Sequence, residues 1–406
     1  MNRKKIWSML ILVSVLVGIL LFRGLQTASA YTATAPNAKC SWKLVPGQDP
    51  STTTVINGGV AVAYKNVWMV GSENNYNGPG PLLQTLTEQW NGTSWQVIAS
   101  PSPGAGYNAL DAIARVPQSQ ELWAVGYQSN TINGPRLDQT LIEHWDGKTW
   151  QVIPSPNVGQ GDNDLFGVTA LSPTDVWAVG TIAENEFQQQ YTLIEHWDGT
   201  QWSVIPSLNP SPYINTLGAI AATSPSDIWA TGTQRPVSGG QSSASLMEHW
   251  DGTQWSVVAS PSPGTAFNGF SSLAVVSSTS VWAVGSAANW SGPAQTLVGH
   301  WDGTQWTVVP SPNPGSSVDI LNAVVSIGSR NIWAVGYDQE GNLPQQTLTI
   351  HWDGAQWKVV PSPNSGSNDN FLDAITRVPA TTSIWAFGTH FVRGTDQDGS
   401  LALFRC

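Results

Sequence analysis

Charged side chains are scarce in this 406-residue chain, where Asp, Glu, Lys and Arg together make up 11% of the residues. An ordinary soluble protein has about a quarter. Lys and Arg number 16 against 27 Asp and Glu, which gives a formal net charge of −11. Nucleic-acid binding requires a basic surface that displaces counterions from phosphates. The composition therefore argues against nucleic acid as a partner and is compatible with cationic partners or bound cations.

Long apolar runs are also missing, except at the N-terminus. A basic segment, Asn2–Lys5, precedes an apolar run from Ile6 to Phe22, and Ala28-Ser29-Ala30 matches a cleavage signal. We interpret residues 1–30 as a signal peptide and 31–39 as a short linker. The alternative is an uncleaved anchor, because the run approaches the length of a membrane span. Either interpretation places the rest of the chain outside the cytoplasm, secreted or at the cell surface, with the membrane as a partner only through an uncleaved segment.

Two Trp-containing motifs recur along the remaining sequence at a fixed offset. The first is an apolar-Trp-small-apolar-Gly strand in seven copies, 51 to 55 residues apart, and the second is a Trp-Asp-Gly-x-x-Trp hairpin in six copies, one with Asn for Asp. Periods of this length indicate a solenoid or a propeller, and Trp residues placed so regularly are expected in the core. The first motif is centred on Trp68, Trp123, Trp177, Trp229, Trp282, Trp333 and Trp385; the second begins at Trp90, Trp145, Trp197, Trp250, Trp301 and Trp352.

Each repeat carries four strand signals. In the sixth repeat they cover residues 321–326, 331–336, 346–352 and 356–360, all short and rich in β-branched or aromatic residues. The Asp-Gly between the third and fourth strands is typical of a tight hairpin, and the Pro-Ser-Pro that follows cannot continue a ladder. The sequence therefore predicts an all-β fold, a seven-bladed β-propeller with four-stranded blades over residues 40–406, expected to be a monomer.

The two chain ends complement each other. Ser400–Cys406 aligns with Thr192–Asp198, so the last repeat lacks a fourth strand, and Ser41–Val45 supplies it. A blade shared in this way removes two open sheet edges. The chain has only two cysteines, and Cys40 and Cys406 both fall at the severed hairpin turn of this blade. We predict a disulfide between them, which an exported protein can form.

The second half of each repeat resembles the kelch family. Val176-Trp177-Ala178-Val179-Gly180 stands where kelch repeats have a glycine pair, and the hairpin within Leu193–Pro206 stands where they have a Tyr and a Trp. The repeat lacks the second glycine and has Trp for Tyr, and its hairpin also resembles a shortened Asp-box of sialidase-like propellers. The resemblance implies the propeller fold over all seven blades, whereas function does not follow from fold. A kelch-type copper-radical oxidase needs a cysteine cross-linked to tyrosine. Both cysteines of this chain are expected in the disulfide, so this activity is not expected.

One face of the predicted propeller carries long and dissimilar loops. Loops between strands 2 and 3 and loops between blades share that face, whereas the opposite face has short, uniform turns. Variable loops on a rigid scaffold favour ligand binding there. Trp290 is outside the repeated pattern, and it is either a ligand platform or a cover for a blade edge. The candidate ligand-binding residues in these loops are Tyr76, Tyr107, Phe187, Tyr213, Trp290, Arg136, Arg235 and Arg393.

The central channel offers a second set of candidates. Asn or Asp precedes the innermost strand in six repeats, and we interpret these residues as bonding to local backbone. Asp111 and Asp373 lie near them without an evident repeat, so they are the better functional candidates. Two carboxyl groups at a suitable separation can serve as acid and base in glycoside chemistry.

Motifs for metal or nucleophilic chemistry are missing. Five histidines share one repeat position, which spreads them around the ring, whereas a metal site needs convergent ligands. Asp396–Gly399 is a fragment of a calcium loop without the later ligands, so no cofactor is expected beyond a weak match to calcium. No nucleophile elbow or phosphate loop is present. The sequence favours an extracellular recognition or scaffold propeller that binds glycan or protein, with a glycan-active hydrolase or lyase as the alternative.

Overall fold

A computed structural model describes residues 40–51, 53–75, 80–132, 137–184, 189–235, 242–366, 368–392 and 397–406. The predicted signal peptide and linker, residues 1–39, lie outside these ranges. Chain contacts set Ser41–Cys406 apart from Met1–Cys40 as a separate compact unit. Every regular element of this unit is a β-strand, numbered β1 to β28. The described residues include no helix long and apolar enough to cross a membrane.

The strands group into seven blades of four. Blade 1 comprises β2 (Thr54–Ala63), β3 (Asn66–Asn74), β4 (Leu83–Trp90) and β5 (Trp95–Val97); blade 2 comprises β6 (Tyr107–Arg115), β7 (Leu122–Ser129), β8 (Asp138–Trp145) and β9 (Trp150–Val152); blade 3 comprises β10 (Asp162–Ser172), β11 (Asp175–Glu184), β12 (Gln189–Trp197) and β13 (Trp202–Val204). Blade 4 comprises β14 (Ile214–Ser224), β15 (Asp227–Arg235), β16 (Ala244–Trp250) and β17 (Trp255–Val257); blade 5 comprises β18 (Phe267–Ser277), β19 (Ser280–Ala288), β20 (Ala294–Trp301) and β21 (Trp306–Val308). Blade 6 comprises β22 (Val318–Gly328), β23 (Asn331–Gln339), β24 (Gln346–Trp352) and β25 (Trp357–Val359); blade 7 comprises β26 (Asn370–Arg377), β27 (Ile384–Val392), β28 (Gln397–Arg405) and β1 (Lys43–Leu44).

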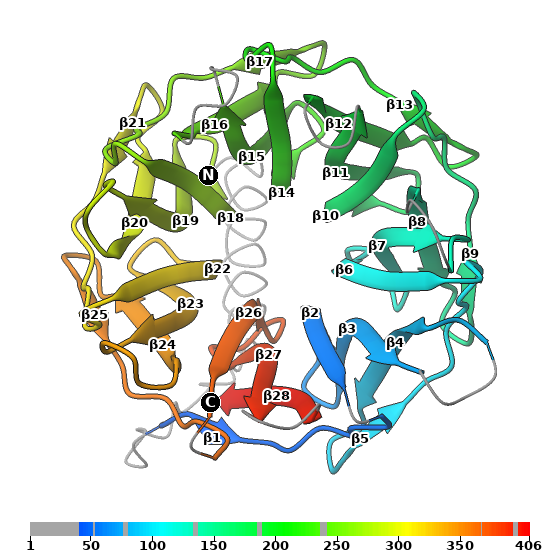
Figure 1. Cartoon of the computed structure of the whole chain (residues 1–406), viewed down its shortest axis with the longest axis horizontal. Helices are drawn as coiled ribbons and strands as arrows, with labels where there is room; N and C mark the ends of the chain where they lie inside the picture. The colour runs from blue at the N-terminus through cyan, green and yellow to red at the C-terminus, as the bar shows by residue number, and fades with distance from the viewer. Residues whose placement is uncertain are drawn as a thin grey trace, which may run out of the picture. The chain divides into compact units, whose positions relative to one another are not determined.

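The predicted β-propeller is confirmed. Within each blade the strands pair antiparallel in chain order, and the first strand of each blade lies nearest the central axis (Figure 1). Isolated parallel pairings at Gln190↔Ile214 and Ala294↔Val318 join two pairs of adjacent blades. The sheet count follows directly from the repeat count, because each Trp-rich repeat supplies one blade.

The tight hairpins between the third and fourth strands are built as predicted. In blade 3 the Asp198 carboxylate accepts hydrogen bonds from the backbone N–H groups of Thr200 and Gln201, at 2.7 and 2.9 Å. Gly199 has φ +96°, a left-handed conformation that glycine adopts without a steric cost. These hydrogen bonds, together with one from the Thr200 hydroxyl, lower the pKa of Asp198 to about 2. The Asp side chain therefore holds the turn through its hydrogen bonds, and the Gly provides the left-handed conformation that the turn requires.

The tryptophans form the interfaces between blades, as the sequence predicted. The Trp of each second strand is buried, and in six blades it packs on the hairpin Trp of the following blade. Trp68 contacts Trp145 with ring centroids 4.8 Å apart, and Trp229 contacts Trp301 at 5.0 Å. The remaining pairs are Trp123–Trp197, Trp177–Trp250, Trp282–Trp352 and Trp385–Trp90. Seven apolar clusters result, each shared by two neighbouring blades.

The chain ends meet in blade 7. Lys43 pairs with Phe404 and Leu44 with Leu403, so β1 is the outermost strand of the blade that contains β28 (Figure 1). The predicted disulfide between Cys40 and Cys406 is present. Cys406 occupies the position of Asp198 in blade 3, and Cys40 occupies the position of Thr200, which donates a hydrogen bond to Asp198. The hairpin Trp is also replaced here, because the Arg405 guanidinium lies 4.7 Å above the Trp333 ring.

The strand boundaries differ from the sequence-based ones mainly in the first strand. In blade 6, β24 covers the predicted 346–352, whereas β22 runs from Val318 to Gly328 through two register shifts, one of them between Leu321 and Ala323. Second strands continue past the repeated glycine, so the loops between strands 2 and 3 are shorter than predicted. In blade 5 the loop covers only residues 289–293, between β19 and β20.

Removal of the disulfide tests the closure. The bond links residues 366 positions apart, and the chain-entropy account gives a stabilisation of about 5 kcal/mol for a loop of this size. We expect the C40S/C406S variant to lose about that much unfolding free energy, measured by chemical denaturation, and wild type to lose a similar amount in reductant. Equal stability of the variant and wild type would contradict a closing role for the bond.

Candidate functional site

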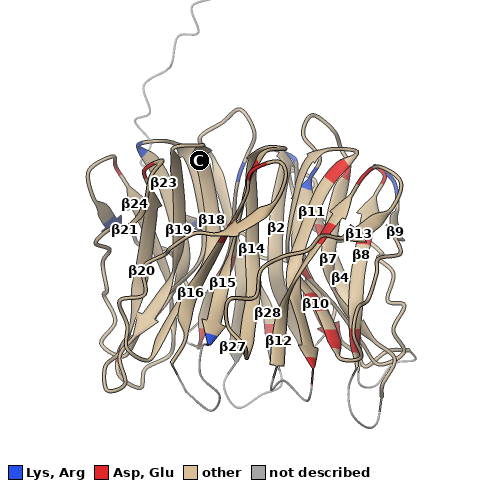
Figure 2. Ribbon diagram, turned by 90° about the horizontal axis from the view of Figure 1, so that it is seen from above, with Lys and Arg blue, Asp and Glu red and all other residues tan. Residues whose placement is uncertain are grey.

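The two faces of the propeller differ in construction and charge. The loop face is formed by loops between strands 2 and 3 and by the linkers between blades, which hydrogen bond to each other, as in Leu82 N–H to the Gly106 carbonyl at 2.8 Å. The turn face is formed by the turns between strands 1 and 2 and between strands 3 and 4. Described Lys and Arg residues lie at or next to the turn face with the exception of Arg235, and acidic residues lie at both faces (Figure 2).

The structure distributes the predicted loop-face residues over several blades. Tyr107 begins β6 in blade 2, and Tyr213 precedes β14 in blade 4; both are half-buried. Arg235 ends β15, where its carbonyl accepts a hydrogen bond from Ser211 Oγ and its Nε is buried without a partner. These side chains therefore do not form one cluster. Tyr76, Arg136, Phe187 and Arg393 lie outside the described residues.

Trp290 is the most distinctive residue of the loop face. Its side chain is 59% exposed in the loop between β19 and β20. The neighbouring Asn289 carboxamide accepts hydrogen bonds from Thr265 N–H at 3.0 Å and from Thr265 Oγ1 at 3.1 Å, which ties this loop to the linker before blade 5. Phe267, at the start of β18 in the same blade, is 41% exposed. An apolar platform is thus held on an anchored loop.

Blade 6 also exposes an apolar side chain on the loop face. Leu343 is 60% exposed in the loop between β23 and β24. Its backbone is fixed on both sides, because Leu343 N–H donates to the Glu340 carbonyl at 3.0 Å and the Leu343 carbonyl accepts from Gln339 Nε2 at 2.9 Å. Gly341 N–H also donates to Ser316 Oγ at 3.0 Å. The loops of blades 5 and 6 are therefore preorganised by hydrogen bonds, which lowers the entropic cost of binding.

The repeated Asn before the innermost strand is structural, as interpreted from the sequence. Asn268 Oδ1 accepts from Gly264 N–H at 2.6 Å, and its Nδ2 donates to the carbonyls of Gly264 and Ser243. Blade 6 has Asp319 at this position. Its Oδ1 accepts from Gly315 N–H at 2.8 Å, but its Oδ2 is buried without a partner. Burial raises the pKa of Asp319 to about 6.

The two channel carboxylates occupy one repeat position after all. Asp111 and Asp373 are the residues at which the register of the first strand shifts, between Leu110 and Ala112 and between Leu372 and Ala374. The carboxylate recurs in two blades only, whereas the position recurs in all seven, three residues after the repeated Asn in blades 2 and 7. The same position in the other five blades holds Asn57, Phe166, Gly218, Ser271 and Asn322.

Each carboxylate at this position is bound by the preceding blade. Asn57 Nδ2 donates to Asp111 Oδ1 at 3.0 Å, and Asn322 Nδ2 donates to Asp373 Oδ1 at 2.8 Å. Burial raises the pKa of Asp373 to about 7, and the hydrogen bond from Asn322 opposes the rise. These contacts join neighbouring innermost strands. Asn57 and Asn322 were missed from the sequence, where nothing marks them as partners of the aspartates.

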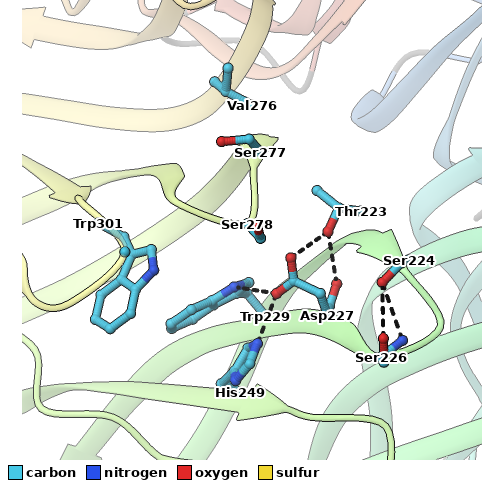
Figure 3. Close-up of a pocket in the computed structure, with 11 residues that line it drawn as sticks. Thr223, Ser224, Ser226, Asp227, Trp229, His249, Val276, Ser277, Ser278 and Trp301 are labelled. Carbon is cyan, nitrogen blue, oxygen red and sulfur yellow. Dashed lines mark hydrogen bonds and ion pairs between the residues drawn. The ribbon is translucent and has the colours of Figure 1, made fainter.

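A pocket of about 760 Å³ lies on the turn face between blades 4 and 5 (Figure 3). His249 Nε2 lies 2.8 Å from Asp227 Oδ1, which also accepts a hydrogen bond from Trp229 Nε1 at 3.1 Å. The histidine ring packs on Trp229, and Trp301, which contacts the Trp229 ring, also lines the pocket. The sequence directed attention to the other face and did not indicate this pocket.

The histidine in this pocket belongs to a repeated structural contact. His196 bonds to Asp175 at 2.8 Å, and His144 lies 3.2 Å from Glu121. In blades 5 and 6 the partners are Ser280 and Asn331. Because the contact persists when the acid is replaced by a neutral residue, it positions the ring against the Trp and does not require an acid–base pair.

No group of three or more His, Cys, Asp or Glu able to hold a metal ion exists among the residues that the structure describes. Of the predicted calcium-loop fragment, Asp398 and Gly399 are strand residues of β28, paired with Phe391 and His390. Asp396 lies outside the described ranges.

No family model and no curated protein matches this sequence. Among solved structures, one described as "YCF48 bound to D1 peptide" matches with a TM-score of 0.53 at 12% identity, over 90% of this chain and 96% of that chain. Trypanosoma rangeli sialidase in complex with sialic acid matches with a TM-score of 0.48 at 11% identity, over 89% of this chain and 57% of that one. The similarities concern the β-propeller fold alone.

Asp319 generates a testable prediction. Its pKa is raised in the folded state, so the stabilisation by the protonated form is present at low pH and is lost as the pH rises through about 6. We expect D319N to raise the unfolding free energy by about 1–3 kcal/mol at pH 7.5, because the amide restores the missing donor. At pH 3 to 4 the variant and wild type should converge, as measured by chemical denaturation.

The reverse substitution N268D in blade 5 is the matched control. It should introduce the same loss of stability between acid and neutral pH. The account of Asp319 fails if D319N has the stability of wild type at pH 7.5, or if N268D shows no dependence on pH.

Proposed function

We propose that this protein is a recognition propeller that acts outside the cytoplasm and binds a glycan or a protein on its loop face. The observation that carries the proposal is Trp290, 59% exposed on a loop anchored by hydrogen bonds. Trp290 takes no part in the repeated packing between blades, and exposed apolar groups gathered on one face mark interaction sites. Phe267 and Leu343, on blades 5 and 6, extend the apolar contact area.

The charge around this surface restricts the ligand. Asp338 and Glu340 lie beside Leu343, and the pKa of Asp338 is raised by burial and by the charge of Glu340. An anionic ligand would add repulsion here, so a neutral or cationic partner is favoured and nucleic acid is disfavoured. Export is supported by the Cys40–Cys406 disulfide, because such bonds persist in oxidising compartments. We also propose that the repeat is kelch-like. This resemblance does not indicate which ligand is bound.

A glycan-active hydrolase or lyase is the second candidate. One observation favours it: burial raises the pKa of Asp373 to about 7, a value suited to a general acid. The hydrogen bonds from Asn57 and Asn322 weaken this candidate, because they occupy one oxygen of each carboxylate and connect adjacent blades. Release of reducing ends from polysaccharides by wild type but not by D373N would establish the hydrolase in place of the recognition function.

The binding proposal is tested on arrays of glycans and of peptides probed with the exported chain. We expect W290A to weaken binding to the best ligand at least tenfold, since a central aromatic contact contributes about 1.4 kcal/mol or more, and L343A to weaken it several-fold. Y64A is the matched control, because Tyr64 is 54% exposed on the turn face. Binding that is insensitive to W290A and L343A but lost in Y64A would place the ligand on the wrong face for this proposal.

A further inference from the structure

Four blades place a glutamate inside the interface with the preceding blade. Two residues before the hairpin Trp, blades 1 to 4 carry a Glu with an exposed fraction of 0%. Side chains alternate along a strand, so each Glu lies on the same face as the buried Leu two residues earlier. That Leu belongs to an apolar cluster shared by two blades. The four residues are Glu88, Glu143, Glu195 and Glu248.

The other three blades fill the same position without a charge. Ile350 in blade 6 and Leu403 in blade 7 are members of the shared apolar clusters. Blade 5 has Gly299, and a Cβ placed there would lie 2.9 Å from the Phe270 ring, which occupies the space. The position is therefore an apolar site in the core, where an aliphatic or aromatic group packs well and glutamate is the exception.

Among the four glutamates, a hydrogen bond from the preceding linker is formed at Glu88. Glu88 accepts a hydrogen bond of 2.9 Å from Gln48 N–H in the linker before blade 1. The corresponding linker residues before blades 2 and 3 are Pro101 and Pro156, which have no N–H to donate. Both carboxyl oxygens of Glu143, Glu195 and Glu248 are buried without a hydrogen-bond partner, as is Oε1 of Glu88.

Few charges act on these groups. Burial alone raises the pKa of Glu195 to about 8 and the pKa of Glu143 well above its usual range. At Glu248 burial raises the pKa to about 8, with the Leu208 N–H opposing the rise. At Glu88 the rise to about 8 is opposed by the Gln48 N–H and increased by Asp49 and Glu73. Among the residues that the structure describes, no cation offsets the burial of any of the four.

We propose that these four glutamates are neutral in the folded propeller and form a pH-sensitive latch on the interfaces of blades 1 to 4. An unpaired charge in an apolar interface is strongly destabilising. When the glutamates ionise, the interfaces 7–1, 1–2, 2–3 and 3–4 loosen first. Interfaces 4–5, 5–6 and 6–7 hold no glutamate at this position and stay closed, and the buried Asp373 of interface 6–7 has a hydrogen bond from Asn322.

The direction of the effect follows from proton linkage. An unfolded chain releases these protons above about pH 4.5, whereas the folded protein keeps those of Glu88, Glu195 and Glu248 to about pH 8, and burial raises the pKa of Glu143 in the same direction. The stabilisation is therefore complete below pH 4.5 and is lost as the pH rises towards 8 and above. In that window each carboxyl makes unfolding roughly tenfold more favourable per pH unit.

The test compares wild type with E143Q/E195Q by chemical denaturation from pH 5 to 9. Gln copies the shape of the neutral acid and cannot ionise. In wild type, Glu143 and Glu195 together should raise the unfolding equilibrium constant by up to a hundredfold per pH unit, and the variant should lack this contribution. E184Q, at the half-buried end of β11, is the matched control and should follow wild type. An unchanged dependence in E143Q/E195Q, or no dependence in wild type, overturns the proposal.

Hydrogen exchange on wild type keeps the proposal testable if the variant does not fold. Amide protection factors are compared at pH 6 and pH 8.5, after correction for the intrinsic exchange rate. From pH 6 to pH 8.5 the protection factors in the third strands of blades 1 to 4 should fall at least tenfold more than those in β20 and β24. Equal changes in both halves of the ring would overturn the latch.

Discussion

The packing of tryptophan between blades is the interaction on which the rest of this structure depends. In six of the seven blades the second-strand Trp is buried against the hairpin Trp of the next blade, so no blade completes its own core. A single repeat therefore leaves an apolar face exposed, and the faces are satisfied only when the ring closes. The seam obeys the same constraint, because Trp42 packs edge-on against Trp333 and Arg405 covers the ring that a hairpin Trp covers elsewhere.

This arrangement separates stability from recognition. The tryptophans, the Asp-Gly turns and the His–Trp contacts lie in the blade interfaces and on the turn face, and they repeat with little variation. The loop face carries what does not repeat, including Trp290 and Leu343, on loops fixed to the linkers. A ligand site there can change without disturbing the interfaces, which is the usual relation between a rigid scaffold and its variable loops.

The parts of the fold that could be predicted from the sequence are those encoded locally. The period of the Trp motifs indicates the blades, the Asp-Gly turns indicate the hairpins, and the cysteines mark the seam. The bulge at Asp111 and Asp373 could not be predicted, because it depends on pairing with the second strand. The buried glutamates were also missed. The Glu two residues before the hairpin Trp is visible in four repeats, but its burial follows only from the strand register and from the blade packed on it.

The central physical claim is that the blade interfaces are too dry to hold a charge. Infrared spectroscopy of the protein with ¹³C-labelled glutamate carboxyl groups tests it most directly. At pH 7 the account predicts a C=O stretching band of protonated glutamic acid in the folded protein, which disappears on unfolding. A folded protein whose glutamates show only ionised carboxylate bands at pH 7 would contradict it.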